Sequence, residues 1–332
     1  MHVITTLDCH VAGEALRVVT SGFPEPAGST ILEKRQYCRD HLDYLRRMLM
    51  WEPRGHHDMY GCLLVTSAHP QADTGVLFFH NEGYSTMCGH GIIGLATVML
   101  EEGLFPTTAP TTTIRFDTPS GLVTAKASLD EGKVRSVAFL NVPSFVLDVR
   151  QTVHVPGIGP VQYDIAFGGA FYAFCQAEPL GLDLKPEHAP RLQAHGLAIK
   201  QALMAERTIS HPTEPELGYL YGTILTGPPQ TPGGDVRQTC IFANGALDRS
   251  PTGTGVSAHL ALLYAKGSLK VGQPLRFESI LGTQFGGKIV EETQLASCPA
   301  IIPEVEGHAW LTGRHEFVID PDDPLKGGFL LG

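Results

Sequence analysis

Two segments of the chain, residues 86–103 and 250–267, repeat one pattern. They read TMCGHGIIGLATVMLEEG and SPTGTGVSAHLALLYAKG, and their superposition aligns three glycine pairs: Gly89 with Gly253, Gly91 with Gly255, and Gly103 with Gly267. Each segment follows an apolar run that ends in an asparagine and a glycine, FFHNEGY in the first copy and CIFANGA in the second. The repeat predicts a duplicated lobe built from a strand, a turn and a helix.

Many short β-like runs separated by glycine and proline surround these two segments, so strands dominate the expected fold. Four segments predict long helices: Ile31–Met50, Gly91–Glu102, Glu187–Glu206 and Gly255–Lys266. The second and fourth are apolar around most of their circumference, which predicts that they are buried. The expected fold class is α/β (α+β), with two lobes that each place a helix inside a curved sheet.

Proline and glycine gather between Pro143 and Pro160, which predicts a linker between the lobes there. We therefore expect an N-terminal lobe over residues 1–145 and a C-terminal lobe over residues 146–299. The tail from about residue 300 to 332 is expected to return to the first lobe.

Composition narrows the class of partner. The chain of 332 residues has 24 basic and 34 acidic residues, a net charge of −10 without a basic run. This balance argues against a nucleic acid or an anionic membrane as partner and favours a small molecule. The first twenty residues lack the pattern of a signal peptide, and no apolar stretch reaches membrane-spanning length, so we expect a cytoplasmic protein.

The seven cysteines, at positions 9, 38, 62, 88, 175, 240 and 298, are odd in number and never form a CxxC pair. Neither a disulfide framework nor a zinc ribbon is indicated, and the histidines show no ligand spacing, so no metal is assigned. The simplest interpretation of an isolated cysteine is a small buried apolar residue. We apply this interpretation to all of them except Cys88.

Cys88 precedes the first of the two buried helices. Backbone N–H groups at a helix N-terminus attract anions, and the same field favours a thiolate, so Cys88 is a candidate nucleophile or base. Two such helix ends that met between the lobes would hold one carboxylate. His90 is either a contact to a substrate amine or a surface histidine, and Asp248 is either a pocket residue or a turn residue before Ser250.

The paired motifs MCGHG (87–91) and DRSPTGTG (248–255) resemble the proline racemase family, as do DCHVAGEALRVV, EPRGHHDMYG, FGGAFYAFC and the tail from residue 301 to 329. The resemblance implies two pseudo-symmetric lobes like those of diaminopimelate epimerase, catalysis without a cofactor, and a homodimer. In family racemases and epimerases, two cysteines face the Cα atom of a bound imino acid. Cys88 matches the first cysteine, but Thr252 stands in place of the second.

This departure predicts the reaction. Inversion by two bases needs a titratable group on each face of the substrate, and an alkyl hydroxyl does not ionise near neutral pH. The resemblance to family members with this Cys/Thr pair implies a hydro-lyase, a trans-3-hydroxy-L-proline dehydratase that yields Δ1-pyrroline-2-carboxylate. Cys88 is then the base, and Thr252 faces the opposite side of the ring.

The resemblance also implies the binding residues. Backbone amides of Gly89, His90, Gly253 and Thr254 would hold the carboxylate, and the side chains of Asp248 and His90 would contact the ring nitrogen.

Three alternatives stay open at this point: a proline racemase or 4-hydroxyproline 2-epimerase, an inactive imino-acid binding protein, and a Cys–His hydrolase. The hydrolase is disfavoured because His90 lies only two residues from the thiol and no orienting partner is evident.

Overall fold

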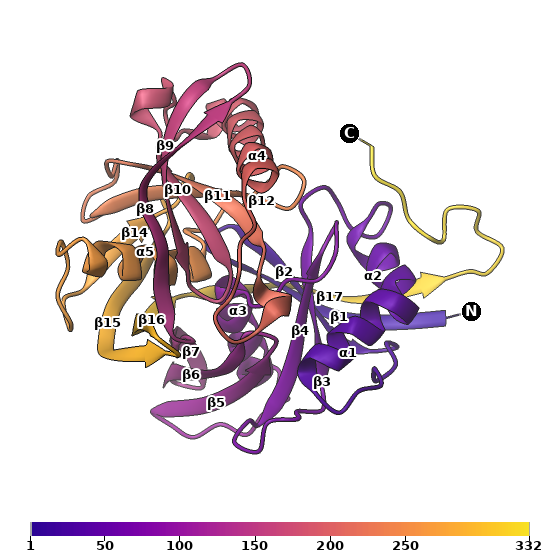
Figure 1. The fold of residues 1–332 in the computed structure, drawn as a ribbon. Helices are drawn as coiled ribbons and strands as arrows, with labels where there is room; N and C mark the ends of the chain where they lie inside the picture. Colours follow the sequence, from indigo (N-terminus) through magenta and orange to yellow (C-terminus); the bar gives the residue numbers. More distant parts are fainter. Residues whose placement is uncertain (1, 332) are drawn as a thin grey trace. The chain divides into compact units, whose positions relative to one another are not determined.

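The computed structural model describes residues 2–331. The chain divides into two compact units (Figure 1). The first comprises the residues up to Phe139 together with those from His308 onward, and the second comprises Leu140–Gly307.

The first unit is built from eight strands and a few helices. Its strands are β1 (His2–Val11), β2 (Glu14–Ser21), β3 (Tyr60–Val65), β4 (Thr74–His80), β5 (Thr111–Thr118), β6 (Gly121–Asp130), β7 (Lys133–Leu140) and β17 (Ala309–Ile319). Its helices are α1 (Ile31–Tyr37), α2 (Asp43–Met50) and α3 (Gly89–Glu101), with a π-helical turn at Cys38–Leu42 between the first two. The helix predicted over Ile31–Met50 is therefore present but interrupted.

The second unit has nine strands. They are β8 (Ser144–Val155), β9 (Gly159–Phe167), β10 (Phe171–Gln176), β11 (Leu220–Gly227), β12 (Val236–Phe242), β13 (Ala246–Leu247), β14 (Leu275–Glu278), β15 (Gln284–Leu295) and β16 (Cys298–Gly307). Its helices are α4 (Ala189–Glu206) and α5 (Gly253–Ala265), with 3-10 turns at Glu178–Leu180, Pro186–His188 and Pro215–Leu217.

Both units follow one strand order. In the first unit neighbouring strands pair in the order β17, β1, β2, β3, β4, β5, β6, and only β2–β3 and β4–β5 are parallel. In the second unit the order is β8, β9, β10, β11, β12, β14, β15, β16, and the parallel pairs β10–β11 and β12–β14 occupy the same places. The duplication predicted from two short segments thus extends over each whole unit.

Local hydrogen bonds repeat as well. Asp73 donates its backbone N–H to the Arg115 carbonyl and accepts the Arg115 N–H on its side chain. Asp235 and Arg276 exchange the same two hydrogen bonds in the second unit. The equivalence aligns β4 with β12. It makes Val76 the counterpart of Gln238, because each residue follows its aspartate by three positions.

A buried helix lies at the centre of each sheet. Helix α3 packs against β1, β2, β6 and β17, and α5 packs against β8, β9, β10, β15 and β16 (Figure 1). Strands from both ends of each pairing order therefore contact the same helix, which requires the sheet to curve around it. Every residue of Gly89–Leu100 and of Gly253–Leu262 is buried, as the all-round apolar pattern predicts.

The region from Pro143 to Pro160 is not a linker. It forms most of the antiparallel hairpin of β8 and β9, and the prolines and glycines lie at strand ends and in the turn. The boundary expected at residue 145 falls inside β8, and the one expected near residue 300 falls inside β16.

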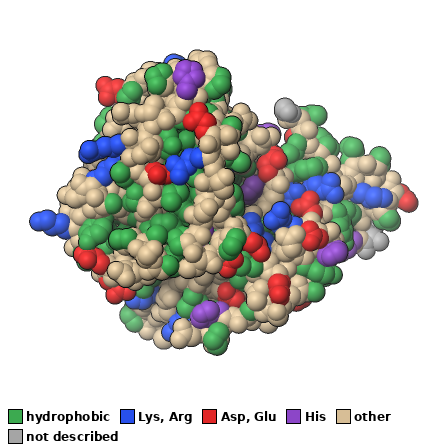
Figure 2. Space-filling view, viewed as in Figure 1, with side chains coloured by type: hydrophobic (Ala, Val, Ile, Leu, Met, Phe, Trp, Pro, Cys, Tyr) green, Lys and Arg blue, Asp and Glu red, His purple; other side chains and the backbone are tan. Residues whose placement is uncertain are grey.

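Within the described residues, no helix is long and apolar enough to cross a membrane. On the face shown in Figure 2, acidic and basic side chains are interspersed among apolar and neutral ones.

Candidate active site

Cys88 is the N-cap residue of helix α3. Its backbone is extended, with φ −142° and ψ 112°, and its Sγ accepts the N–H of Gly91 at 3.2 Å. The residue is buried, with 5% of its surface exposed. A sulfur at this position is close to the positive end of the helix dipole, which favours the thiolate form.

His90 contacts the same sulfur. Its Nδ1 atom lies 3.1 Å from Cys88 Sγ, so the first turn of α3 brings together two residues that are only two positions apart. The Tyr60 ring meets the His90 ring edge-on, with 4.8 Å between centroids, and the Tyr60 hydroxyl is hydrogen-bonded to Ser85. A contact between His90 and the thiol was not among the predictions, which assigned His90 to a substrate amine or to the surface.

Thr252 occupies the equivalent N-cap position of helix α5 but has a different geometry. Its φ is +66° and its ψ is 92°, a region that β-branched residues rarely adopt. Its hydroxyl does not cap the helix and instead donates to Asp248 Oδ2 at 2.7 Å. This bond uses the hydroxyl proton, which is the only hydrogen-bond donor of the Thr252 side chain.

Asp248 is the centre of the loop before α5. Its Oδ1 accepts the N–H of Ser250 at 2.8 Å, and Ser250 Oγ in turn accepts the N–H of Thr252 at 3.0 Å. Both interpretations of Asp248 thus have support, since it closes a turn and also presents a buried carboxylate beside Thr252.

The aligned glycines leave room for the N-cap side chains. A Cβ atom on Gly91 would lie 2.4 Å from the Phe78 ring and 3.1 Å from Cys88 Sγ. A Cβ atom on Gly255 would lie 2.5 Å from Ile224 Cδ1 and 3.1 Å from Thr252 Cγ2. A larger residue at either glycine would therefore collide with a strand residue behind the helix and crowd the N-cap side chain.

The candidate residues form two sets. Cys88, Gly89 and His90 lie together at the start of α3, whereas Asp248, Thr252, Gly253 and Thr254 lie together at the start of α5. The action of both sets on one ligand stays a prediction.

Three residues on other strands contact the candidate loops and were not among the predicted site residues. Tyr60 packs on His90, the Tyr172 hydroxyl is hydrogen-bonded to Thr254 Oγ1 at 2.6 Å, and Gln238 Nε2 donates to the Pro251 carbonyl at 2.7 Å. Tyr60 and Tyr172 lie in the family-like stretches EPRGHHDMYG and FGGAFYAFC, but no role was assigned to them there, and Gln238 lies outside every quoted motif. Only the pairing of distant strands brings them to the helix ends.

Four of the six other cysteines are poor bases at neutral pH. Burial raises the pKa of Cys9, Cys38 and Cys175 to about 12, and it raises the pKa of Cys62 well above its ordinary value. These thiols stay protonated at neutral pH, as expected of buried apolar residues. Among residues 2–331, no group of three or more His, Cys, Asp or Glu side chains is arranged to hold a metal ion.

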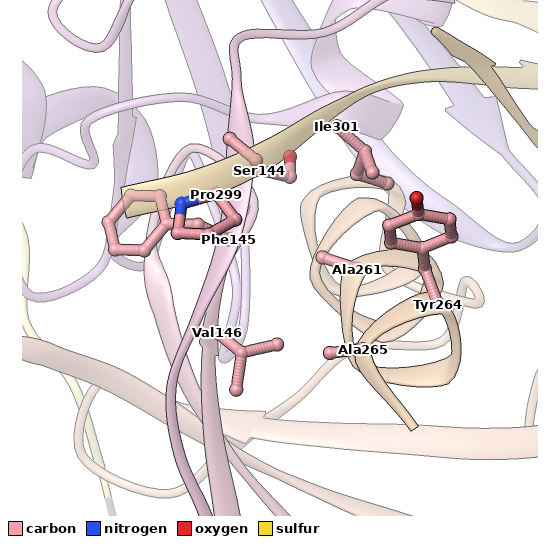
Figure 3. A pocket seen from close by; sticks show the side chains of 9 residues that line it. Ser144, Phe145, Val146, Ala261, Tyr264, Ala265, Pro299 and Ile301 are labelled. Carbon is pink, nitrogen blue, oxygen red and sulfur yellow. The ribbon is translucent and has the colours of Figure 1, made fainter. Parts of the chain in front are cut away.

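A cavity of about 240 Å³ in the second unit is a separate feature. It is lined by mostly apolar residues, among them Phe145, Ala261, Tyr264 and Ile301 (Figure 3). Its α5 residues lie in the C-terminal part of the helix, far along the axis from Thr252, so this cavity is not the candidate active site.

Comparisons with known proteins agree with the two motifs. The family model described as proline racemase matches residues 6–330. A protein of Colwellia psychrerythraea named trans-3-hydroxy-L-proline dehydratase is 47% identical over 99% of this chain and 92% of its own length. A proline racemase of Clostridioides difficile is 42% identical over 99% of this chain and 98% of its own length.

A solved structure confirms the fold. The crystal structure of a hydroxyproline epimerase from Agrobacterium vitis, with bound trans-4-hydroxy-L-proline, superposes with a TM-score of 0.94 at 32% identity and covers 99% of this chain and 96% of its own. The agreement extends over both units and both motif loops. The chain belongs to the proline racemase family.

Proposed function

We propose that the protein is a dehydratase that converts trans-3-hydroxy-L-proline to Δ1-pyrroline-2-carboxylate, with Cys88 as its base. The observation that carries the proposal is the difference between the two helix N-caps. One presents a thiol with a histidine nitrogen 3.1 Å from its sulfur, and the other presents a threonine hydroxyl that donates to Asp248.

This difference separates elimination from inversion. Racemases and epimerases that work without a cofactor need one group to remove the Cα proton and another to return a proton from the opposite face. A threonine hydroxyl has no accessible ionisation near neutral pH, and here its proton is already donated to a carboxylate. If the substrate carries a hydroxyl on Cβ, the carbanion that forms when Cys88 removes the Cα proton can lose that hydroxyl instead of gaining a second proton.

The proposed step is a syn elimination in which Cys88 carries one proton. The Cys88 thiolate takes the Cα proton, the Cα–H electron pair forms the Cα–Cβ double bond, and the Cβ–O bond breaks. In a five-membered ring with the hydroxyl trans to the carboxylate, the Cα hydrogen and the hydroxyl share one face. Cys88 can therefore return the same proton to the departing oxygen, which leaves as water. The enamine then moves a proton from nitrogen to Cβ and becomes the imine.

The binding roles assigned from the family resemblance fit the local chemistry. Gly89, His90, Gly253 and Thr254 are the first two residues of α3 and α5, where backbone N–H groups have no intrahelical acceptor. We propose that they hold the substrate carboxylate and stabilise the charge that develops on it. Asp248 and His90 are proposed to contact the ring nitrogen, and each Asp248 oxygen can accept a further hydrogen bond beside the one it has.

Relatives support the family and leave the reaction to be tested. The Colwellia protein carries the name of the dehydratase, whereas other relatives are named racemase or epimerase. The proposed reaction uses only groups of this chain and needs no cofactor. The homodimer and the cytoplasmic location remain predictions.

The direct test is incubation of the protein with trans-3-hydroxy-L-proline, followed by reduction with borohydride and chiral analysis. The proposal predicts proline, formed by reduction of the imine. Recovery of an epimer of the substrate, with solvent deuterium at Cα, would favour the epimerase. Calorimetric binding of pyrrole-2-carboxylate without any product would favour the inactive binding protein.

A further inference from the structure

The loop that ends at Thr252 is supported from behind by a buried polar pair. Gln238, on β12, donates its side-chain Nε2 to the Pro251 carbonyl at 2.7 Å. Gln238 Oε1 lies 2.8 Å from Nδ1 of His259, on α5. Gln238 is fully buried and His259 is 7% exposed.

The direction of these bonds fixes the state of the histidine. A carbonyl only accepts, so the amide nitrogen of Gln238 must face Pro251 and its oxygen must face His259. His259 Nδ1 therefore carries a proton and donates it. Burial, with a smaller effect of Lys266, lowers the pKa of His259 to about 4, so the ring is neutral and Nδ1 holds its single proton. Asp164 acts in the opposite sense, and Phe174 and Phe277 pack on the ring.

The bonds clamp the peptide that sets the φ of Thr252. Its carbonyl, that of Pro251, accepts from Gln238, and its N–H, that of Thr252, donates to Ser250 Oγ. On the other side of Thr252, its own carbonyl accepts from Val256 at 2.7 Å at the start of α5. Both peptide planes that flank the residue are thereby held, which maintains the unfavourable φ of +66°.

Among the described residues of the first unit, the positions equivalent to this polar pair hold apolar side chains. The strand equivalence makes Val76 the counterpart of Gln238, and the helix repeat makes Leu95 the counterpart of His259. Both are fully buried apolar residues, and the N-cap residue of that unit, Cys88, has an ordinary extended backbone. The polar pair thus occurs in the unit whose N-cap residue has the strained conformation.

We propose that His259 and Gln238 are positioning residues for the second half-site, which hold Thr252 away from the helix so that the first amides of α5 can bind the substrate carboxylate. The inference rests on the proposed function for the identity of the substrate. Independently of the substrate, His259 acts on the loop through Gln238, although His259 lies almost two turns, or about 9 Å, along α5 from Gly253.

The test compares five variants with the wild type. H259L and Q238V install the residues of the first unit singly, H259L/Q238V installs both, and H259N retains a donor near the Nδ1 position. T223V is the matched control, because it removes another buried bond to backbone in the same unit, from Thr223 to the Gly196 carbonyl at 2.9 Å. Readouts are the Kd for pyrrole-2-carboxylate, the KM and kcat for trans-3-hydroxy-L-proline, and the melting temperature.

We expect H259L and Q238V each to raise Kd and KM about tenfold, the loss associated with one buried hydrogen bond. Kd and KM of the double variant should not exceed those of the more strongly affected single variant, because His259 acts only through Gln238. H259N should stay close to wild type, and T223V should lose stability while its Kd and KM do not change.

Wild-type Kd and KM in folded H259L and Q238V would overturn the inference, as would additive effects in the double variant or an equal loss in T223V. Failure of the proposed function looks different. In that case the wild type forms no imine, although the Kd values for pyrrole-2-carboxylate still follow the predicted order across the variants.

Discussion

Helix α3 begins at a residue with extended backbone whose sulfur caps the helix, whereas helix α5 begins at a residue with φ of +66° whose hydroxyl does not. The two helices have the same length and share the glycines at their first and third positions, and equivalent strands surround them. The duplication thus preserved the scaffold while the chemistry of one residue, and the loop that carries it, diverged. Two equivalent frames therefore carry a thiol at one N-cap position and a hydroxyl at the other.

The divergence extends behind the N-cap residues. Cys88 has a common backbone conformation, and the counterparts of Gln238 and His259 in its unit are the buried apolar residues Val76 and Leu95. Thr252 donates its N–H to Ser250 and its hydroxyl to Asp248, and Gln238 donates to the carbonyl of the preceding residue, Pro251. The start of α5 therefore depends on a buried polar loop, whereas the start of α3 is an ordinary helix cap formed by a thiol.

Removal of the base at α3 is expected to have the largest effect. Cys88→Ser should lower kcat about a thousandfold or more, because a serine hydroxyl is not ionised near neutral pH and general-base catalysis supplies a factor of this order. The measurement is the initial rate of imine formation at saturating trans-3-hydroxy-L-proline. Cys240→Ser, another buried cysteine, is the matched control. Near wild-type turnover by Cys88→Ser would exclude the thiol as the base.

Removal of the carboxylate at α5 should have the next largest effect. Asp248→Asn is expected to lower kcat/KM about a hundredfold, since bonds to a charged group contribute roughly 1.5–3 kcal/mol each. Asp235→Asn is the control, because Asp235 also closes a turn by accepting a backbone N–H in the second unit. Equal losses in the two variants would mean that Asp248 only shapes the loop.

The histidine behind the second loop predicts a dependence of stability on pH. His259 has a pKa of about 4 when folded, against about 6.5 in an unfolded chain. Between these values the unfolded chain binds a proton that the folded one does not, so His259 stabilises the fold fully above pH 6.5 and less as the pH falls. The loss amounts to about 2 kcal/mol by pH 5.

The measurement is denaturant unfolding of wild type and H259L at pH 7 and pH 5. Because other groups titrate equally in both proteins, the difference between them isolates the histidine. Wild type should lose more stability than H259L over this interval. An equal loss would show that His259 is already protonated or solvated in the folded state.

The sequence was sufficient for much of the fold. The glycine repeat around Cys88 and Thr252 predicted the duplication, and the all-round apolar pattern predicted that both helices are buried. The supposed linker near Pro143 was wrong, because proline marks strand ends as readily as linkers.

The candidate site was predictable only in part. The motifs made Cys88 and Asp248 candidates, since both lie in short local patterns at helix starts, and their roles stay predictions. The left-handed φ of Thr252, the contact of His90 with the thiol and the role of Gln238 could not be predicted in this way. They depend on the direction of a peptide plane or on a strand far away in the chain, and neither leaves a local signal.

The central claim is that the protein has one base where a racemase needs two. Wild type and Thr252→Cys should be incubated side by side with L-proline in deuterium oxide, and the product examined for D-proline and for deuterium at Cα. The account predicts no D-proline from wild type, and it predicts D-proline with deuterium at Cα from the variant, because the variant has a titratable group on each face. Rapid formation of deuterated D-proline by the wild type would contradict it.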